Sequence, residues 1–514
     1  MQETVTKRWY HYALFVITFF VVVVLSYGTF SHPRLLGPLN QQVVNRTVIV
    51  IKENNSIVCD PNVRFRLDVP RSEYTIEVNK ELLNCHIPER DSRDLASRLD
   101  FMWRHRWGPM YRRGCWAPTF SRINRTSNTL IIDCPPSMKP KYSFRTRNSL
   151  SENYIGPISM GEHEWVYTQC NLPFYMEPVT RLHLHALPLP EPQPTVKQRP
   201  NVIFMQFDAL GRQAMYRRMP RSYKLLTTYG TSNSPTHTLP GLRDARGIEF
   251  RHLNVNGRNS EPNMRRVYCG SGNCQKTSLL RLYKQAGYST SLLESYSYQL
   301  PNYIPSKAVD RVLASNFFGE FGGDTVELYN NRGGCVTGTT WIADEMFDYL
   351  SHRFNSMRSG GWFSINNMVD PHTEDELVNY AVLDTKFYDF LLAVNKSQAL
   401  DNTIMIILGD HGLHGHDWKE LWREFDHRNP PLYILIGKNV TGFTDIIKNL
   451  EANSDKLVSH GDIYMTFARF AKSSLPLSLS NTVNLFTEKI SKDRTCRSAG
   501  IPDEWCNCWV PKPC

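Results

Sequence analysis

The sequence predicts an α/β fold in which a central, mostly parallel sheet carries helices on both faces. Two observations indicate this fold. Short apolar runs rich in β-branched and aromatic residues, such as 201–207 and 403–408, are typical of buried strands. Beyond residue 200 such runs alternate with segments whose apolar residues recur at helical spacing. The chain has 514 residues, which is enough for this domain and an accessory region.

The N-terminal part predicts a membrane anchor. Residues 12–30 are almost uninterruptedly apolar, near the length that a helix needs to cross a bilayer. Lys7 and Arg8 precede this run, so residues 1–11 are expected to be a cytosolic tail, although Arg34 weakens the charge bias. We therefore predict a transmembrane signal anchor and a single-pass type II protein of the secretory pathway or cell surface. A cleaved signal peptide, which would give a secreted protein, is the alternative.

The next segments predict an oxidising compartment. Residues 31–186 are expected to form a luminal, mostly β accessory region with disulfides, because most of the 12 cysteines of the chain lie in polar, loop-like surroundings. Five sequons agree with this location, at Asn45, Asn54, Asn124, Asn395 and Asn439.

Residues 187–199 are rich in proline and are expected to be an extended linker. The α/β domain then spans residues 200–490, and residues 491–514 form a Cys-rich C-terminal tail. In the tail, disulfides fit better than a zinc site because no paired Cys-x-x-Cys spacing is present. In chain order the expected elements are strand 201–207, helix 211–229, strand 288–293, helix 340–356, strand 362–367, helix 376–394, strand 403–408 and strand 431–436.

Two of these strands end on metal-type ligands. Asp208 follows the strand 201–207, and Asp410 and His411 follow the strand 403–408. Because the carboxyl ends of parallel strands line one edge of a sheet, these side chains are expected to converge on one cation. Two carboxylates and an imidazole suit zinc or manganese. The alternative is that Asp208 only caps the next helix and that Asp410 and His411 only form a turn.

A serine between these strands is a candidate nucleophile. Ser260 lies in Asn259-Ser260-Glu-Pro262-Asn263, which has the form of a helix start. A hydroxyl there lies beside backbone amides that attract an oxyanion such as phosphate or sulfate. A cation held by Asp208, Asp410 and His411 would activate it. The alternative is a serine that only caps a helix.

Six motifs in this order carry a family resemblance. They are Pro200-Asn-Val-Ile with Asp208-Ala-Leu-Gly-Arg212 and Met219-Pro220, Gly257-Arg-Asn-Ser260-Glu-Pro-Asn263, Gly287-Tyr288 with Glu294, His372, Asn402-Thr403 with Asp410-His411-Gly412, and Cys496 with Cys506-Asn-Cys508. This pattern resembles the alkaline-phosphatase superfamily of phosphatases, phosphodiesterases, sulfatases and phosphoethanolamine transferases. Over residues 200–510 it most resembles an extracellular animal family catalogued as domain of unknown function 229.

The resemblance implies an alkaline-phosphatase-like sheet, with one metal on Asp208, Asp410 and His411. Ser260 stands where the family usually has a threonine nucleophile. His372 matches a family histidine and implies a second metal position. We expect His416 to contribute there, with His414 and His427 as alternatives.

The predicted function is a metal-dependent phosphoester hydrolase or phosphotransferase. Zinc is the expected divalent metal, with calcium or manganese as alternatives, and the substrate would be a phosphorylated or acidic small molecule, lipid or glycan. The net charge of +10 agrees with an acidic substrate, but its even spread without a long basic block argues against nucleic acid.

Departures from the family pattern leave other functions open. Relatives carry Asp-Ser-x-Ser-Arg where this chain has Asp208-Ala-Leu-Gly-Arg212, so a catalytically inactive binding or structural glycoprotein is an alternative. A sulfuric-ester hydrolase is a further alternative. The chain lacks a complete formylglycine motif, which argues against this alternative. Met264 stands where Cys/Ser-x-Pro-x-Arg requires arginine. A Golgi glycosyltransferase is disfavoured because the chain has no Asp-x-Asp.

Overall fold

The computed structural model contains two compact units, Met1–Arg64 with Pro513–Cys514, and Phe65–Lys512. In the first unit β1 (Lys52–Glu53) and β2 (Ser56–Ile57) form an antiparallel pair, and every other element belongs to the second. The structure describes residues 52–53, 56–57, 76–78, 119–145, 150, 152–173, 178–227, 245–270, 272–295, 308–314, 335–336, 340–357, 360–369, 376–413, 421–471, 481–507 and 509–511.

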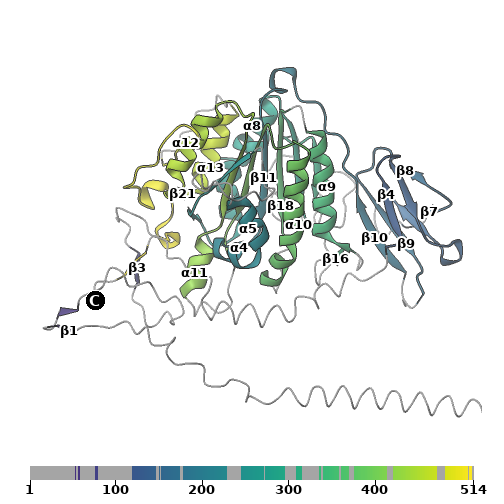
Figure 1. Ribbon diagram of the computed structural model, residues 1–514, viewed down its shortest axis with the longest axis horizontal. Helices are drawn as coiled ribbons and strands as arrows, with labels where there is room; N and C mark the ends of the chain where they lie inside the picture. The colour runs from purple at the N-terminus through teal and green to yellow at the C-terminus, as the bar shows by residue number, and fades with distance from the viewer. Residues whose placement is uncertain are drawn as a thin grey trace, which may run out of the picture. The chain divides into compact units, whose positions relative to one another are not determined.

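A seven-stranded mixed sheet forms the centre of the second unit (Figure 1). Its five neighbouring strands from β19 to β15 are parallel, whereas β20 is antiparallel to β19 and β12 is antiparallel to β20. The predicted α/β fold with a mostly parallel sheet is therefore confirmed. In spatial order the strands are β12 (Ala245–Glu249), β20 (Leu432–Gly437), β19 (Thr403–Gly409), β11 (Asn201–Phe207), β18 (Trp362–Met368), β14 (Ser289–Glu294) and β15 (Arg311–Ala314).

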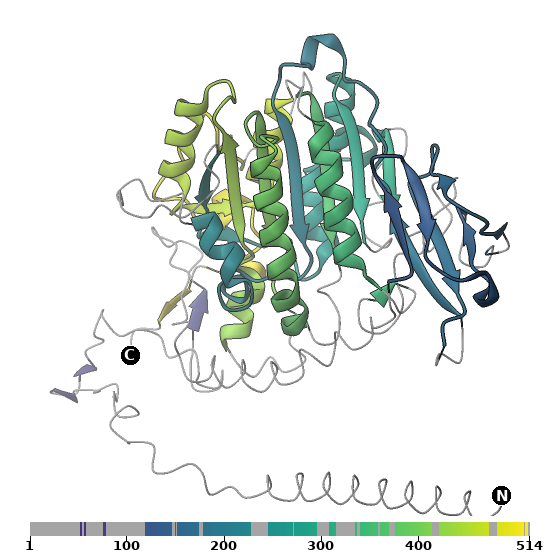
Figure 2. The ribbon, with the colours of Figure 1, turned by 45° about the vertical axis from the view of Figure 1, so that its right-hand side comes forward.

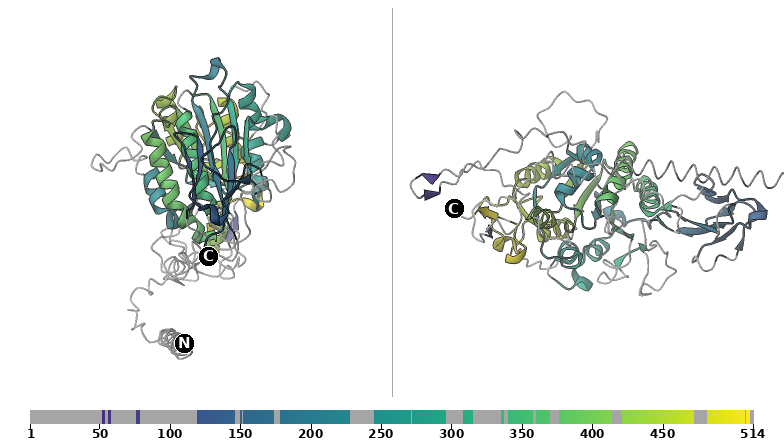
Figure 3. Two further views of the ribbon diagram at one scale, coloured as in Figure 1. Left: turned by 90° about the vertical axis from the view of Figure 1, so that its right-hand side faces the viewer. Right: turned by 90° about the horizontal axis from the view of Figure 1, so that it is seen from below.

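Helices cover both faces of this sheet (Figures 2 and 3). Successive side chains of β11 explain why both faces need cover: Ile203 and Met205 join one apolar core, and Val202 and Phe204 join the other. The first core is covered by α4 (Arg212–Arg218), α5 (Pro220–Thr227), α9 (Ile342–Ser356) and α10 (Glu376–Lys396). The second is covered by α6 (Ser260–Cys269), α7 (Cys274–Thr277), α8 (Leu279–Gln285), α12 (Phe443–Asn453) and α13 (His460–Phe470).

The prediction of one helix over 211–229 is wrong. The chain forms α4 and α5 instead, and the break lies at Met219. Pro220 causes it, because proline has no N–H to continue a helix but is well suited to begin one.

Within residues 119–184, the accessory region forms two small antiparallel sheets. Apolar residues of both join one core, and the disulfide Cys134–Cys170 is part of it. The outer face of the larger sheet packs on the main domain, since Tyr167 and Leu182 belong to the same core as α9. One sheet contains β4 (Ser121–Asn124), β5 (Thr129–Ile132) and β8 (Ile158–Ser159), and the other contains β10 (Val179–Leu184), β9 (Trp165–Cys170), β6 (Lys141–Ser143) and β7 (Glu152–Asn153). The predicted disulfide-bearing β structure is thus present in this part.

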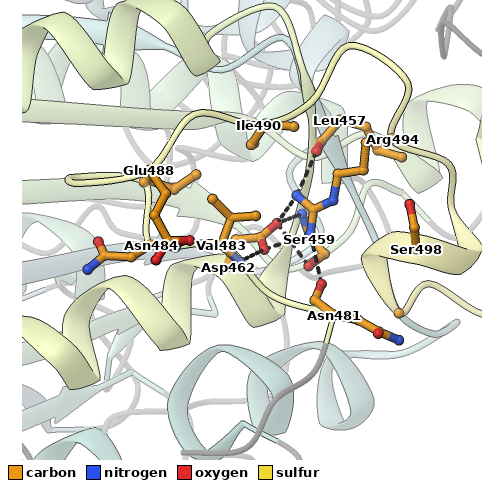
Figure 4. A network of polar contacts seen from close by, with 12 residues as sticks. Leu457, Ser459, Asp462, Asn481, Val483, Asn484, Glu488, Ile490, Arg494 and Ser498 are labelled. Atoms are coloured by element: carbon orange, nitrogen blue, oxygen red, sulfur yellow. Dashed lines mark hydrogen bonds and ion pairs between the residues drawn. The ribbon is translucent and has the colours of Figure 1, made fainter.

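The C-terminal segment is fixed to the start of α13. Arg494 donates hydrogen bonds to both carboxylate oxygens of Asp462 and to the carbonyls of Leu457 and Asn481 (Figure 4). Leu457 belongs to β21 (Leu457–Ser459), which pairs in parallel with β13 (His252–Asn254). Farther on, the disulfide Cys496–Cys506 closes a loop with two short 3₁₀ helices. Asn254 at the end of β13 donates to the Trp505 carbonyl, so this loop contacts the chain just before α6.

Several predictions concern residues outside the described ranges, and they stay predictions. They are the anchor at residues 12–30, the sequons Asn45 and Asn54, and His372, His414 and His416. Within the described ranges no helix is long and apolar enough to cross a membrane. Of the other predicted glycosylation sites, Asn124 and Asn439 are exposed and Asn395 is half-buried on α10.

Candidate metal centre

Asp208, Asp410 and His411 lie together at the carboxyl edge of the sheet. β11 and β19 are parallel neighbours, and Phe207 is paired with Gly409, so the next residue of each strand lies at the same level. All three side chains are fully buried, and one potential ligand atom from each lies within 4.8 Å of the others. The predicted convergence of these three residues is therefore present in the structure.

The orientation of His411 directs one ring nitrogen toward the carboxylates. Its Nδ1 lies 2.6 Å from the carbonyl oxygen of Gly412, and because a carbonyl only accepts, Nδ1 must carry the hydrogen. In the neutral ring Nε2 then has a lone pair. Nε2 lies 3.4 Å from Asp410 Oδ2 and 3.9 Å from Asp208 Oδ1. This is the tautomer that binds a metal through Nε2.

One hydrogen bond holds the Asp410 carboxylate, and another holds the main chain at Asp208. Asp410 Oδ1 accepts a hydrogen bond of 3.0 Å from the N–H of Ala209. Ala209 has a φ of 56°, a left-handed conformation that is costly for a residue with a Cβ and is concentrated at functional sites. The hydroxyl of Tyr380 donates to the Asp208 carbonyl at 2.6 Å. Tyr380 has no distinguishing sequence signal, because it lies on an otherwise core-facing helix.

Ser260 completes the cluster. It is the first residue of α6, and its Oγ donates to Asp208 Oδ1 at 3.2 Å and lies 3.1 Å from His411 Nε2. Its side chain is only 7% exposed, so solvent water weakens these hydrogen bonds little. The predicted nucleophile thus lies against two of the three predicted ligands, from a segment about 150 residues away from His411 in sequence.

The loop before Ser260 is shaped by Asn263. Its Oδ1 accepts from the N–H groups of Asn256 and Gly257, at 2.7 and 3.0 Å. Its Nδ2 donates to the carbonyls of Gly257 and Asn259, at 3.0 and 2.9 Å. Asn263 is fully buried, and one amide therefore fixes the whole turn. The sequence motif contained this residue, but not the reason for it.

The donor set fits a divalent cation. Asp410 Oδ2 is buried and accepts no hydrogen bond from the described residues, and among these residues no lysine or arginine forms an ion pair with Asp410. Two buried carboxylates facing an imidazole lone pair repel one another without positive charge. In tetrahedral coordination with metal–ligand bonds of about 2.1 Å, the ligand atoms lie about 3.4 Å apart. The separation of His411 Nε2 and Asp410 Oδ2 matches this value.

Two further histidines lie near the cluster. The His427 ring is 5.2 Å from the His411 ring, but its Nε2 is hydrogen-bonded to the Arg258 carbonyl. His460, which the sequence did not single out, is fully buried at the start of α13. Burial lowers the pKa of His460 to about 3, against the opposing effect of Asp410. It is a neutral imidazole beside the site.

Residues 323–514 match the family described as Protein of unknown function (DUF229). The predicted resemblance to this family is confirmed over these residues, which begin after Asp208 and Ser260. The match includes β19 with Asp410 and His411 and the tail with Cys496–Cys506. No curated protein matches the chain.

Several solved structures are similar to the chain at low identity. One is a protein in the alkaline phosphatase superfamily from Vibrio parahaemolyticus, with 16% identity over 54% of this chain and 68% of that chain and a TM-score of 0.36. Another is the C-terminal periplasmic domain of EcEptC from Escherichia coli in complex with Zn, with 11% identity, coverages of 60% and 92% and a TM-score of 0.40. The lipoteichoic acid synthase LtaP from Listeria monocytogenes has 11% identity, coverages of 57% and 76% and a TM-score of 0.37. Because these TM-scores are low, the function proposed below rests on this chain's own residues.

Proposed function

We propose that the chain is a metal-dependent phosphoester hydrolase or phosphotransferase with Ser260 as nucleophile. One observation carries this proposal: the Ser260 hydroxyl lies within 3.2 Å of ligand atoms of both Asp208 and His411 in a buried cluster. A serine hydroxyl is a weak nucleophile until a base or a cation activates it. A divalent cation held by Asp208, Asp410 and His411 would supply Lewis-acid stabilisation of negative charge on the Ser260 and phosphoryl oxygens.

The residues of the chain provide orientation and anion binding. Donation of the Ser260 hydrogen to Asp208 Oδ1 fixes the direction of the remaining Oγ lone pairs. Ser260 begins α6, and the Asn259 side chain makes no capping hydrogen bond to that helix. The N–H groups of the first turn of α6 therefore suit a phosphoryl oxygen.

The reaction would proceed in two halves. Ser260 Oγ forms a bond to phosphorus while the bond from phosphorus to the leaving oxygen breaks. The proton that the Ser260 hydroxyl loses to solvent balances the proton that the leaving oxygen takes up. The oxygen of water or of an acceptor hydroxyl then attacks the phosphorus, the bond from phosphorus to Ser260 Oγ breaks, and the proton lost by the attacking hydroxyl balances the one that Ser260 Oγ regains. Water gives a hydrolase and another hydroxyl gives a transferase.

The experiment uses the full-length chain purified in detergent and supplied with zinc, manganese or calcium. We expect metal-dependent cleavage of an aryl phosphodiester or monoester, and a loss of about 10³-fold or more in Ser260→Ala. Metal binding should persist in that variant, because its ligands are unchanged. Ser498→Ala is the control, since Ser498 is exposed in the C-terminal tail. Full activity of metal-loaded Ser260→Ala would exclude Ser260 as nucleophile.

The non-catalytic alternative has one feature in its favour. Ala209, which is fully buried next to Asp208, brings a methyl group where relatives have a hydroxyl. Metal analysis separates the alternatives, because a binding protein has no need of a stoichiometric divalent cation. Cleavage of an aryl sulfate but not of an aryl phosphate would favour the sulfuric-ester alternative.

We further propose that residues 31–514 are luminal or extracellular, tethered to the membrane by the segment 12–30. The disulfides Cys134–Cys170, Cys269–Cys274 and Cys496–Cys506 support an oxidising compartment, and the exposure of Asn124 and Asn439 suits glycosylation. Treatment of the cellular protein with an N-glycosidase tests this, and we expect a lower apparent mass. An unchanged mass, together with free thiols, would contradict it.

A further inference from the structure

His427 connects the nucleophile loop to the predicted metal ligand His411. It lies near the end of α11 (Leu421–Arg428) and is fully buried. Its Nε2 lies 2.9 Å from the carbonyl oxygen of Arg258. Because this oxygen only accepts, Nε2 is the donor. Arg258 is two residues before Ser260, so this hydrogen bond fixes the last turn of chain before the nucleophile.

The other contacts of His427 lead to His411. Its backbone carbonyl accepts the N–H of Gly412 at 2.8 Å, and the Gly412 carbonyl accepts the His411 Nδ1 hydrogen at 2.6 Å. The rings of His427 and His411 are 5.2 Å apart. One residue thus holds both the loop that carries Ser260 and the turn that orients His411.

The C-terminal disulfide loop packs against His427 and its neighbour Arg428. The ring of Trp505 is 6.0 Å from that of His427, and the Arg428 guanidinium lies 5.6 Å from the Trp505 centroid and donates to the Cys506 carbonyl at 3.1 Å. Asn254, just before the nucleophile loop, donates to the Trp505 carbonyl and accepts the N–H of Asn507.

We propose that His427 is a positioning residue, which sets Ser260 against His411 by donating to the Arg258 carbonyl. The proposal rests on the proposed function for its catalytic consequence. Its structural consequence, a fixed conformation of residues 256–260, is measurable without activity.

The test compares His427→Phe with His427→Gln in the full-length chain. Phenylalanine keeps a ring beside Trp505 but has no donor, whereas glutamine keeps an N–H donor. We expect kcat to fall about 10- to 100-fold in His427→Phe, with KM within about threefold of the wild type, and most of kcat to be retained in His427→Gln. Amide hydrogen exchange over residues 256–260 should rise about tenfold in His427→Phe only.

His183→Phe is the matched control. His183 is also a buried histidine, hydrogen-bonded to Ser121 at 2.8 Å, but it lies in the accessory sheet. It should lower the melting temperature without changing exchange over residues 256–260. Unchanged exchange in His427→Phe, or equal damage in His427→Gln, would overturn the positioning role. If the wild-type chain cleaves no phosphoester with any metal, the proposed function fails, and the exchange result alone then decides the role of His427.

Discussion

The geometry of the loop before Ser260 depends on one small residue, Gly257. Gly257 opens the turn that Asn263 holds, and a Cβ at Gly257 would lie 2.5 Å from Pro262 Cγ. Pro262 is in the first turn of α6, and its ring is closed onto the backbone nitrogen, so it cannot rotate away. Residue 257 therefore has to be glycine for a steric reason rather than for a left-handed backbone.

We predict that Gly257→Ala destabilises the chain by about 1–3 kcal/mol and lowers phosphoesterase activity, because the clash shifts the loop before Ser260. Thermal unfolding and kcat measure the two effects. Gly156→Ala is the control, since a Cβ at Gly156 meets no atom within 4 Å and should cost less than about 0.5 kcal/mol. Equal stability of the two variants would contradict the steric argument.

At the scale of elements, the C-terminal segment is attached by one buried ion pair. Arg494 and Asp462 are 6% and 0% exposed, and their bidentate bonds of 2.8 Å join the segment to the N-terminus of α13. Asp462 also accepts from the Ser459 N–H in the capping box of that helix. Loss of the arginine would leave a buried carboxylate without its cation.

Arg494→Met should therefore cost about 3–5 kcal/mol, as measured by urea unfolding of the full-length chain. The same substitution at Arg497 is the control. Arg497 lies 4.0 Å from Asp503, and the two side chains are 68% and 40% exposed, so its loss should cost less than about 1 kcal/mol. The prediction would be wrong if both variants unfolded at the same urea concentration.

At the scale of the whole second unit, charged and ionisable groups lie where the accessory sheet meets α9. Glu164 accepts hydrogen bonds from Tyr349 and Arg353, at 3.0 and 2.8 Å. Burial raises the pKa of Glu345 to about 7, although Arg181 opposes this. In the same sheet burial lowers the pKa of His183 to about 3, and Arg181 and Arg125 act in the same direction.

The two shifts have opposite effects on stability as the pH changes. Glu345 binds its proton more tightly in the folded state, so between about pH 4.5 and pH 7 its contribution to stability falls as the pH rises. His183 binds its proton less tightly in the folded state. Its contribution is therefore complete above its ordinary pKa of 6.5 and is lost as the pH falls toward about 3.

We predict that His183→Gln lowers the signed slope of the unfolding free energy against pH, because the positive contribution of His183 is lost and the negative contribution of Glu345 remains. Between about pH 5 and about pH 6 the slope should fall by about 1 kcal/mol per pH unit, the effect of one proton. Urea unfolding at several pH values measures it. His163→Gln is the control, because the His163 side chain is exposed to solvent and should leave the slope unchanged. A slope that is the same in wild type and His183→Gln would show that His183 is not buried as a neutral ring.

The strands and the metal ligands that follow them could be predicted, because each signal lies within a few neighbouring residues. β11 and β19 match the expected ranges to within one residue, and a predicted ligand directly follows each strand. Pro220 is a local signal for the break between α4 and α5, but the prediction continued one helix through it. The roles of Asn263 and Tyr380 could not be predicted, because their partners are fixed only when distant segments pack.

The sequence by itself determined which residues could bind a cation, since a carboxylate that ends a buried apolar run must lie at the edge of a sheet. Only the tertiary structure decided that Ser260 reaches both Asp208 and His411, and that His427 donates to Arg258. The physical reason is that these contacts join segments 52, 151 and 169 residues apart. Packing of the whole core, not local preference, sets distances over such separations.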